Sequence, residues 1–316
     1  MTSLRIEPAV AAPHRPRQTT RRRLGLPIML VTGWLASSAV PAAAGGDDTA
    51  GTAPELAASS GFSPSDKARV LYAGDSIAAE TRDMVAFWTQ ASGKAQLFDS
   101  IFPGLAICDF LEDKPAGMPA AQKLRAKVRA VRPHLVILQF WGNALTPCMS
   151  GFTAGTEAYY NQYFWDALNA VNQITAGAAD AGIPRPKILW VLQGPDSGNR
   201  DRVRRLNETY AFAASNSGDR TSDAGFDVSM AAYPFDNAVK DRLAWTQFLP
   251  CTQFERDAGW CTSPAFGGVA QLHKDQDPVH FCLGTVTNIF TCDRTSPGIS
   301  RYGMHIAHDA TVWLGI

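Results

Sequence analysis

Short apolar runs that alternate with helical patterns are the feature that most constrains the fold of this chain. Strand-like runs are predicted at Val70–Ala73, Ala95–Phe102, His134–Phe140 and Lys187–Leu192, with Phe226–Ser229 as a candidate last strand. Helical spacing of apolar residues is found at Ala78–Ala91, Ala120–Val131, Glu157–Ala181, Asp201–Asn216 and Tyr302–Leu314. Strands that alternate with helices form βαβ units, whose parallel sheet is covered by helices on both faces. The sequence therefore predicts an α/β fold with a parallel central sheet.

Residues 230–300 break this alternation. They hold many aromatic residues and four of the six cysteines, and their apolar residues show little periodicity. We interpret them as a long C-terminal excursion stapled by disulfides, after which the last helical pattern closes the fold. The folded domain is expected to span residues 67–316.

The N-terminus has the pattern of an export signal. Arg21–Arg23 precede an apolar stretch, Leu24–Val40, and the small residues of Pro41–Gly45 follow it. A basic flank, a short apolar core and an A-x-A arrangement are what signal peptidases recognise. Residues 1–44 are therefore predicted to be an export signal or, alternatively, an N-terminal membrane anchor. Residues 45–66, rich in Ala, Gly, Ser and Thr, are predicted to be a flexible linker.

Export in either form predicts a protein that is secreted or associated with a bacterial cell envelope.

Charge excludes nucleic acid as a partner. Six of the 29 basic residues but only one of the 29 acidic residues lie in residues 1–23, which leaves 23 basic and 28 acidic residues for the rest of the chain. Binding to nucleic acid needs a dense positive surface, and no long basic run supplies one.

The cysteines agree with export. All six follow the predicted signal: Cys108, Cys148, Cys251, Cys261, Cys282 and Cys292. An even number in an exported chain favours three disulfides, although six cysteines allow 15 connectivities. A zinc site is not expected, because the chain has no CxxC or HExxH spacing. His305 and His308 lack a cluster of further ligands and are assigned to surface or packing roles.

Ser76 is the first candidate for chemistry. It follows a predicted strand through Gly74-Asp75 and precedes a predicted helix, which puts it at the carboxyl edge of the sheet, where ligands of α/β proteins bind. Its backbone N–H would lie at a helix N-terminus, where developing negative charge is stabilised. A serine at this position can also be a simple helix cap.

Asp277 and His280 are the candidates for its activation. A serine is a weak nucleophile until a base takes its proton, and that base needs a carboxylate to orient it. Three residues of separation on a helical turn would place Asp277 and His280 on one face, with the other imidazole nitrogen directed at Ser76. An Asp-x-x-His pair on its own is common and also fits a solvated turn.

Two further strand ends offer hydrogen-bond donors. Asn143 follows the apolar run that ends in Phe140-Trp141-Gly142, and Gly104 follows Phe102-Pro103. A side-chain amide and a glycine N–H at these positions could stabilise an oxyanion. The alternative for both is an ordinary turn.

In this order the four elements resemble the SGNH/GDSL hydrolases, a family of serine esterases. The resemblance covers roughly residues 70–281 and is most specific at Gly74-Asp75-Ser76 and Asp277-x-x-His280. It implies a flavodoxin-like three-layer α/β/α sandwich. It also implies that Ser76 is the nucleophile, His280 the general base and Asp277 its orienting carboxylate. The implied oxyanion hole comprises the N–H groups of Ser76 and Gly104 and the side-chain amide of Asn143.

The third block departs from the family pattern Gly-x-Asn-Asp. Trp141 stands where the glycine is expected, Gly142 abuts Asn143, and Ala144 replaces the aspartate. This tryptophan-bearing block and the cysteines on either side of it are similar to SGNH domains fused to membrane acyltransferases that modify bacterial surface glycans. That likeness suggests the pair Cys108–Cys148. Proximity and the implied fold suggest Cys251–Cys261 and Cys282–Cys292.

The function expected from this resemblance is hydrolysis of an O-acetyl or other short-chain O-acyl ester on an envelope or extracellular carbohydrate. No metal or organic cofactor is expected, and the partners are an acylated carbohydrate or other small ester, with peripheral association to the envelope. One alternative is an O-acyltransferase with the same three residues. A second is a non-catalytic glycan-binding envelope domain. A lipase is less favoured, because no sustained apolar lid segment is found.

Overall fold

The computed structural model describes residues 66–115, 117–232, 241–263, 268–275, 277–286, 292–293 and 296–316. The predicted signal at residues 1–44 and residues 45–65 of the predicted linker lie outside this range. All the described residues belong to the second of two units into which the chain divides, residues 59–316. Over these described segments, we find no helix with the length and hydropathy needed to cross a bilayer.

Five parallel strands form the central sheet: β1 (Ala68–Gly74), β2 (Ala95–Ile101), β3 (Leu135–Gln139), β4 (Lys187–Val191) and β5 (Arg220–Ser222). Their spatial order is β2-β1-β3-β4-β5. This is the flavodoxin-like doubly wound order, in which ligands bind beyond the carboxyl ends of the strands where the winding reverses. The predicted α/β fold with a parallel sheet is confirmed.

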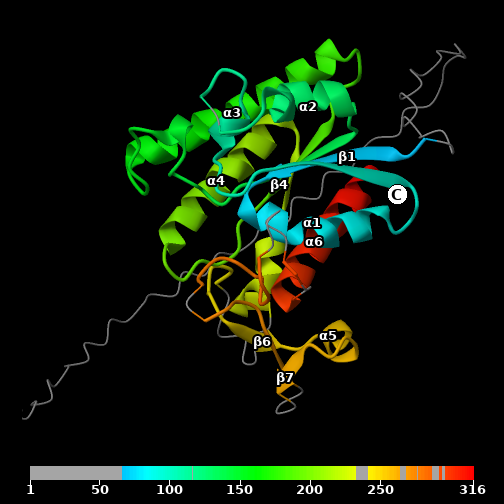
Figure 1. Ribbon diagram of the computed structural model, residues 1–316, viewed down its shortest axis with the longest axis vertical. Helices are drawn as coiled ribbons and strands as arrows, with labels where there is room; N and C mark the ends of the chain where they lie inside the picture. Colours follow the sequence, from blue (N-terminus) through cyan, green and yellow to red (C-terminus); the bar gives the residue numbers. More distant parts are fainter. Residues whose placement is uncertain are drawn as a thin grey trace, which may run out of the picture. The chain divides into compact units, whose positions relative to one another are not determined.

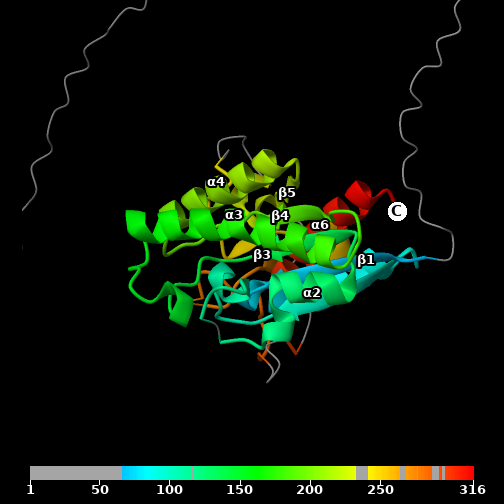
Figure 2. The ribbon, with the colours of Figure 1, turned by 90° about the horizontal axis from the view of Figure 1, so that it is seen from above.

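Helices cover both faces of the sheet: α1 (Ser76–Gln90), α2 (Leu124–Val131), α3 (Glu157–Asp180), α4 (Arg200–Ser217) and α6 (Pro297–Leu314). Alternate strand residues feed two cores. Leu71 packs in the core with α2, α3 and α4, whereas Tyr72 packs in the core with α1 and α6. Figure 1 shows the two groups of helices on opposite sides of the sheet, and Figure 2 looks onto the side of α2 and α3. The result is the expected three-layer α/β/α sandwich.

Two helices differ from their predicted extents. The predicted helix Ala120–Val131 is interrupted at Lys123, which has an extended backbone between a short 3-10 turn, η2 (Ala120–Gln122), and α2. The Lys123 ammonium is buried, and it donates to the carbonyls of Leu111 and Lys114 at 2.7 and 2.8 Å. The need to satisfy this buried charge explains the break. Helix α6 starts at Pro297, five residues before the predicted start, as suits a proline in the first turn.

The candidate last strand, Phe226–Ser229, is wrong. Those residues lie in or directly after a 3-10 helix, η4 (Ala224–Val228), and the fifth strand is the preceding segment Arg220–Ser222. A side chain at Gly225 would come within 2.5 Å of the Gln193 carbonyl, so the chain here packs tightly beside the sheet instead of extending it. β5 is short, polar and at the sheet edge, so it carries no apolar signal.

The C-terminal excursion contains secondary structure that the sequence did not reveal. A small antiparallel sheet has the order β6-β8-β7, built from β6 (Phe248–Pro250), β7 (Cys261–Ser263) and β8 (Val269–Gln271). A short helix, α5 (Gln253–Asp257), lies between its first two strands. The other short 3-10 turns are η1 (Ile107–Phe110), η3 (Pro147–Met149) and η5 (Met230–Ala232).

Three disulfides join Cys108 to Cys148, Cys251 to Cys261 and Cys282 to Cys292, the pairs suggested above. The first links η1 to η3, so the loops after β2 and β3 are joined to each other. The other two each close a loop within the excursion. Covalent loop closure stabilises a fold mainly by restricting the unfolded chain, which suits a segment with little apolar core of its own.

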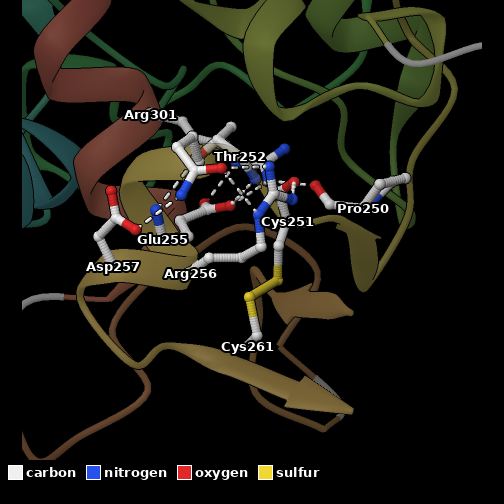
Figure 3. The surroundings of a disulfide bond; sticks show 9 residues. Pro250, Cys251, Thr252, Glu255, Arg256, Asp257, Cys261 and Arg301 are labelled. Atoms are coloured by element: carbon white, nitrogen blue, oxygen red, sulfur yellow. Dashed lines mark hydrogen bonds and ion pairs between the residues drawn. A yellow bond between two sulfur atoms is a disulfide. The ribbon is translucent and has the colours of Figure 1, made fainter. Parts of the chain in front are cut away.

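A buried ion pair attaches the excursion to α6 (Figure 3). The guanidinium of Arg301 donates to both carboxylate oxygens of Glu255 at 2.6 Å and to the Pro250 carbonyl at 2.7 Å. Glu255 also accepts from the N–H of Thr252 at 2.8 Å, which completes a capping box at the start of α5. Both charged side chains are at least 95% buried. The ion pair of Arg301 with Glu255 thereby connects α5, β6 and α6.

Replacing Arg301 with methionine should destabilise the chain by about 3–5 kcal/mol, because it leaves the buried Glu255 carboxylate without its counter-charge. The control is Arg204→Met, which removes a guanidinium paired with Asp201 and Glu208 on the exposed surface of α4. Urea unfolding of both variants measures the difference. Equal midpoints would show that the buried pair does not hold the excursion.

Candidate active site

Ser76 lies where β1 passes into α1. Its neighbour Asp75 is the N-cap of α1 and accepts the N–H of Ile77 at 3.2 Å, so Ser76 is the first residue of the helix. Gly74 allows this sharp connection. A β-carbon at Gly74 would lie 2.2 Å from the Gln139 carbonyl of the neighbouring strand and 2.6 Å from the Ala78 side chain. The Ser76 side chain is half-buried at the carboxyl edge of the sheet.

The structure brings His280 to Ser76 across 204 residues of sequence. His280 Nε2 lies 3.0 Å from Ser76 Oγ, and His280 Nδ1 lies 3.2 Å from Asp277 Oδ2. The three side chains therefore form a continuous hydrogen-bonded relay from hydroxyl to imidazole to carboxylate. This is the geometry that a serine nucleophile, its base and an orienting carboxylate require.

The predicted helical turn between Asp277 and His280 is wrong. The segment is a bend without helical structure. Asp277 Oδ1 accepts the N–H groups of Val279 and His280 at 3.0 and 2.9 Å, a side-chain-to-backbone turn of the kind that aspartate forms. This turn orients the carboxylate toward the imidazole and leaves Oδ2 available to His280 Nδ1.

The electrostatics of the pair suit a base. Burial alone would lower the pKa of His280, but its hydrogen bond to Asp277 and the nearby charges of Glu80, Asp277 and Asp75 raise the pKa above 6.5. Burial would raise the pKa of Asp277, but its hydrogen bonds to His280 and Val279 hold the pKa well below its usual range. Asp277 is therefore ionised at neutral pH and favours an imidazole with the proton on Nδ1, which leaves Nε2 free to face Ser76.

Asn143 is fixed beneath the site by the carboxylate of Asp75. The Asn143 side-chain amide donates to Asp75 Oδ2 at 3.1 Å and to the Leu105 carbonyl at 3.0 Å. Asp75 Oδ2 also accepts the backbone N–H of Trp141 at 2.5 Å. Both amide hydrogens of Asn143 are thus engaged with protein oxygens. An oxyanion could bind Asn143 only by displacing one of these contacts. The contact with the Leu105 carbonyl is the weaker candidate to keep, because this acceptor is neutral whereas Asp75 is a carboxylate.

Gly104 and the backbone of Ser76 offer unoccupied donors. Among the described residues, neither backbone N–H has a hydrogen-bond partner. Gly104 has a left-handed backbone, with φ of +79°, and a β-carbon at this position would meet no atom within 4 Å. Its backbone therefore borders open space. Tyrosines of α3 hold the backbone at Asn143, since Tyr159 and Tyr163 donate to the carbonyls of Gly142 and Asn143 at 2.6 Å.

These groups line a single open pocket of about 450 Å³ beyond the carboxyl end of β1. Its lining includes every predicted catalytic and oxyanion residue and several residues without a predicted role in the chemistry. The full lining is Ser76, Glu80, Pro103, Gly104, Asn143, Lys274, Asp277, His280, Cys282 and Val286. The volume lies in the range of small-molecule sites.

Two acidic residues of the site were missed from sequence. In the sequence, Asp75 stands out only as part of the serine motif, although its carboxylate is fully buried and accepts the backbone N–H of Trp141. Glu80 is 95% buried, lines the pocket and accepts the backbone N–H of Phe281 at 2.8 Å. The sequence signal that could have identified Glu80 is its distance from Ser76, since a residue four positions later lies on the same side of the helix.

The remaining histidines lie outside the predicted relay. His305 pairs with Asp227 at 2.7 Å and with Asp309 at 3.3 Å, and these hydrogen bonds raise its pKa to about 9, as expected for a packing role on α6. Within the described residues, one group of metal-ligating types is close enough to share an ion, namely Cys108, Asp109 and Cys148. Its two sulfurs are joined in a disulfide, so these residues do not fit a metal.

A scan against known protein families and a search of curated proteins both return no match. The chain is similar to solved structures of SGNH/GDSL-type esterases at low identity. A carbohydrate acetylesterase from Sinorhizobium meliloti matches with 14% identity, 78% of this chain, 100% of that chain and a TM-score of 0.46. A carbohydrate esterase family 3 protein from Talaromyces cellulolyticus matches with 13% identity, 78% and 98% coverage and a TM-score of 0.47. A lipolytic protein of the G-D-S-L family from Desulfitobacterium hafniense matches with 11% identity, 77% and 99% coverage and a TM-score of 0.41.

Gly74→Ala should destabilise the chain by about 1–3 kcal/mol or more, because the added methyl meets backbone oxygen and a helix methyl at once. Gly117→Ala is the matched control, since its β-carbon would make only an ordinary contact of 3.5 Å with Leu105. Thermal unfolding of both variants provides the comparison. A Gly74→Ala chain as stable as the control would mean that the strand ends can separate without cost.

Proposed function

We propose that this chain is a serine esterase that hydrolyses an O-acyl ester, with an acetyl or other short acyl group carried by a carbohydrate. The observation that carries the proposal is the hydrogen-bonded relay from Ser76 Oγ through His280 to Asp277 at the edge of an open pocket. A domain that only binds glycans has no use for a half-buried hydroxyl in contact with an oriented imidazole, so the relay favours an enzyme.

The reaction would begin with attack of Ser76 Oγ on the ester carbonyl carbon while His280 Nε2 takes the hydroxyl proton. The tetrahedral intermediate then collapses, the bond to the alcohol oxygen breaks, and His280 gives its proton to the departing alcohol. A water molecule, deprotonated by His280 in turn, attacks the acyl-serine and releases the carboxylic acid. Asp277 stabilises the imidazolium in both stages and stays ionised throughout.

The negative charge on the carbonyl oxygen would be stabilised by the free N–H groups of Ser76 and Gly104. Both are backbone donors in fixed positions, so they need no reorganisation when the charge develops. Asn143 would add a third donor when its amide exchanges the Leu105 carbonyl for the substrate oxygen. Its contact with Asp75 is unchanged in that step, so the amide stays in place.

The pocket supports a short acyl group and a polar alcohol. Its lining combines apolar side chains, from Pro103 and Val286, with the polar side chains of Glu80, Asn143 and Lys274. The polar side chains can form hydrogen bonds with a sugar hydroxyl, and the apolar ones can pack against a short acyl group. The N-terminal signal pattern supports a place outside the cytoplasm, as a secreted or envelope-associated protein, where acylated glycans are substrates.

Ser76→Ala should lower turnover of p-nitrophenyl acetate by about 10⁴-fold or more, because no other group replaces the nucleophile. Ser150→Ala, at an exposed position outside the pocket, is the control and should match the unmodified chain. Comparing acetate with longer esters and an acetylated sugar measures preference for the acyl group and the alcohol. Adding a glycan acceptor and analysing the products would reveal acyl transfer. Equal rates for both alanine variants would remove Ser76 from the mechanism.

The value of kcat/KM should rise with pH through a pKa above 6.5, because His280 accepts the serine proton only when neutral. Asp277→Asn should move this acid limb to lower pH, since the amide withdraws the charge that favours the imidazolium, and should reduce kcat by about 10⁴-fold. His305→Gln removes the other Asp-paired histidine and should leave the acid limb in place. A limb that moves with His305 and not with Asp277 would contradict the assignment of the base.

A further inference from the structure

The backbone of the base is held by side chains at each of its polar atoms. The N–H and C=O of His280 meet Asp277 Oδ1 and His273 Nδ1, each at 2.9 Å. The N–H and C=O of Phe281 meet Glu80 Oε2 at 2.8 Å and Ser296 Oγ at 2.5 Å. Since this segment lacks a regular backbone partner, these four contacts take the place of a strand or helix.

Glu80 and His273 share one peptide unit. The carbonyl that His273 binds and the N–H that Glu80 binds belong to the same planar peptide bond, between His280 and Phe281. A peptide plane held at both polar atoms cannot rotate without losing a hydrogen bond to a buried side chain. Its orientation decides where the imidazole of His280 points, because the side chain branches from the α-carbon next to it.

Both side chains are placed rigidly. Glu80 is 95% buried and belongs to α1, the helix that also starts with Ser76. His273 is 99% buried between two aromatic rings, with ring centroids 5.4 Å from Trp245 and 4.9 Å from Phe281. Trp245 in turn donates to the Pro278 carbonyl at 3.0 Å. Helix α1 therefore positions both groups: it carries Ser76 itself, and through Glu80 it holds the peptide next to His280.

His273 acts as a neutral donor. A carbonyl oxygen can only accept, so Nδ1 carries the hydrogen in the contact with His280. Burial lowers the pKa of His273, which keeps the ring uncharged. Its Nε2 is buried and has no hydrogen-bond partner among the described residues.

Several charged groups act on the imidazole of His280. Asp277 is hydrogen-bonded to the imidazole, and the carboxylates of Glu80 and Asp75 also raise its pKa. His273, which is neutral, contacts the backbone carbonyl of His280. Lys274 lines the same pocket, where its ammonium donates to the Gly284 carbonyl. Burial raises the pKa of Glu80 to about 7, with the charge of His280 and the N–H of Phe281 opposing the rise. The charges of Glu80 and His280 each act on the other group, so the titrations of the two groups are coupled.

We propose that Glu80 and His273 are positioning residues for His280. Glu80 fixes the peptide bond between His280 and Phe281 and adds a second carboxylate beside the imidazole. His273 fixes the same peptide bond but adds no charge. The inference rests on the proposed function, since it assigns His280 the role of base. It separates two effects of Glu80, a hydrogen bond to Phe281 and a negative charge near His280, that different variants can remove.

The test compares E80Q, E80A, H273N and H273F with D166N as control. Asp166 is another buried carboxyl of raised pKa, but it lies on α3, accepts from Gln162 and does not line the pocket. The His280 ring is titrated by NMR in each full-length protein with labelled histidine and assigned with H280N. Ester turnover is measured on the same samples.

E80Q keeps an oxygen for the Phe281 N–H but loses the charge, so His280 should titrate about one pH unit lower, and E80Q should keep a higher kcat than E80A. E80A loses both and should also lose about tenfold or more in kcat. H273N keeps a donor near the position of Nδ1 and should retain more activity than H273F. In both variants, His280 should titrate close to its position in the unmodified chain. D166N should leave both quantities unchanged.

An unchanged His280 titration in both E80Q and E80A would overturn the electrostatic role. Equal kcat in E80A and E80Q, or in H273F and H273N, would overturn the positioning role of the residue concerned. If E80A does not fold, the isosteric E80Q still decides the charge effect, and the H273 pair decides the hold. The NMR titration does not require turnover, so a chain inactive toward every ester would contradict the proposed function separately.

Discussion

The buried carboxylate of Asp75 is the interaction on which the site depends. It caps α1 through the N–H of Ile77, accepts the N–H of Trp141 and binds the side-chain amide of Asn143. Burial raises its pKa to about 6, against the hydrogen bonds that favour the ionised form. One side chain thereby joins the ends of β1 and β3. Without that junction, the Ser76 nucleophile and the Asn143 amide would belong to two independent loops.

The base reaches this junction from a part of the chain with little regular structure. Among the described residues of the excursion that carries Asp277 and His280, Leu249, Leu272 and Phe281 belong to the core shared with α1 and α6, and the small sheet is a three-stranded antiparallel one. The excursion is attached to the sandwich at separate points, among them the buried pair of Arg301 with Glu255 and the contact of Glu80 with Phe281. Polar contacts of this kind are directional, so they orient the base where nonpolar packing alone would leave it free to shift.

Sequence patterns predicted those elements whose residues share one period. The buried strands β1, β3 and β4 and the long helices α3 and α4 follow runs that are apolar throughout or apolar at helical spacing. The predictions failed where tertiary contacts override local preference. Lys123 breaks a helical pattern to satisfy a buried ammonium, and the polar edge strand β5 shows no apolar signal. At Asp277 the prediction of a helical turn is wrong, because a three-residue spacing fits both a helix and a side-chain-to-backbone turn.

By itself the sequence determined the α/β class, the strand ends that carry Ser76, Gly104 and Asn143, and the residue types capable of a serine relay. These features depend on residues that are close in sequence, since strand and helix periods and glycine turns each involve only a few neighbouring residues. Only the tertiary structure decided that His280 lies 3.0 Å from Ser76, that Asn143 is held by Asp75, and that Glu80 and His273 hold the base. Those contacts join residues far apart in sequence, and their distances depend on how both faces of the sheet are packed.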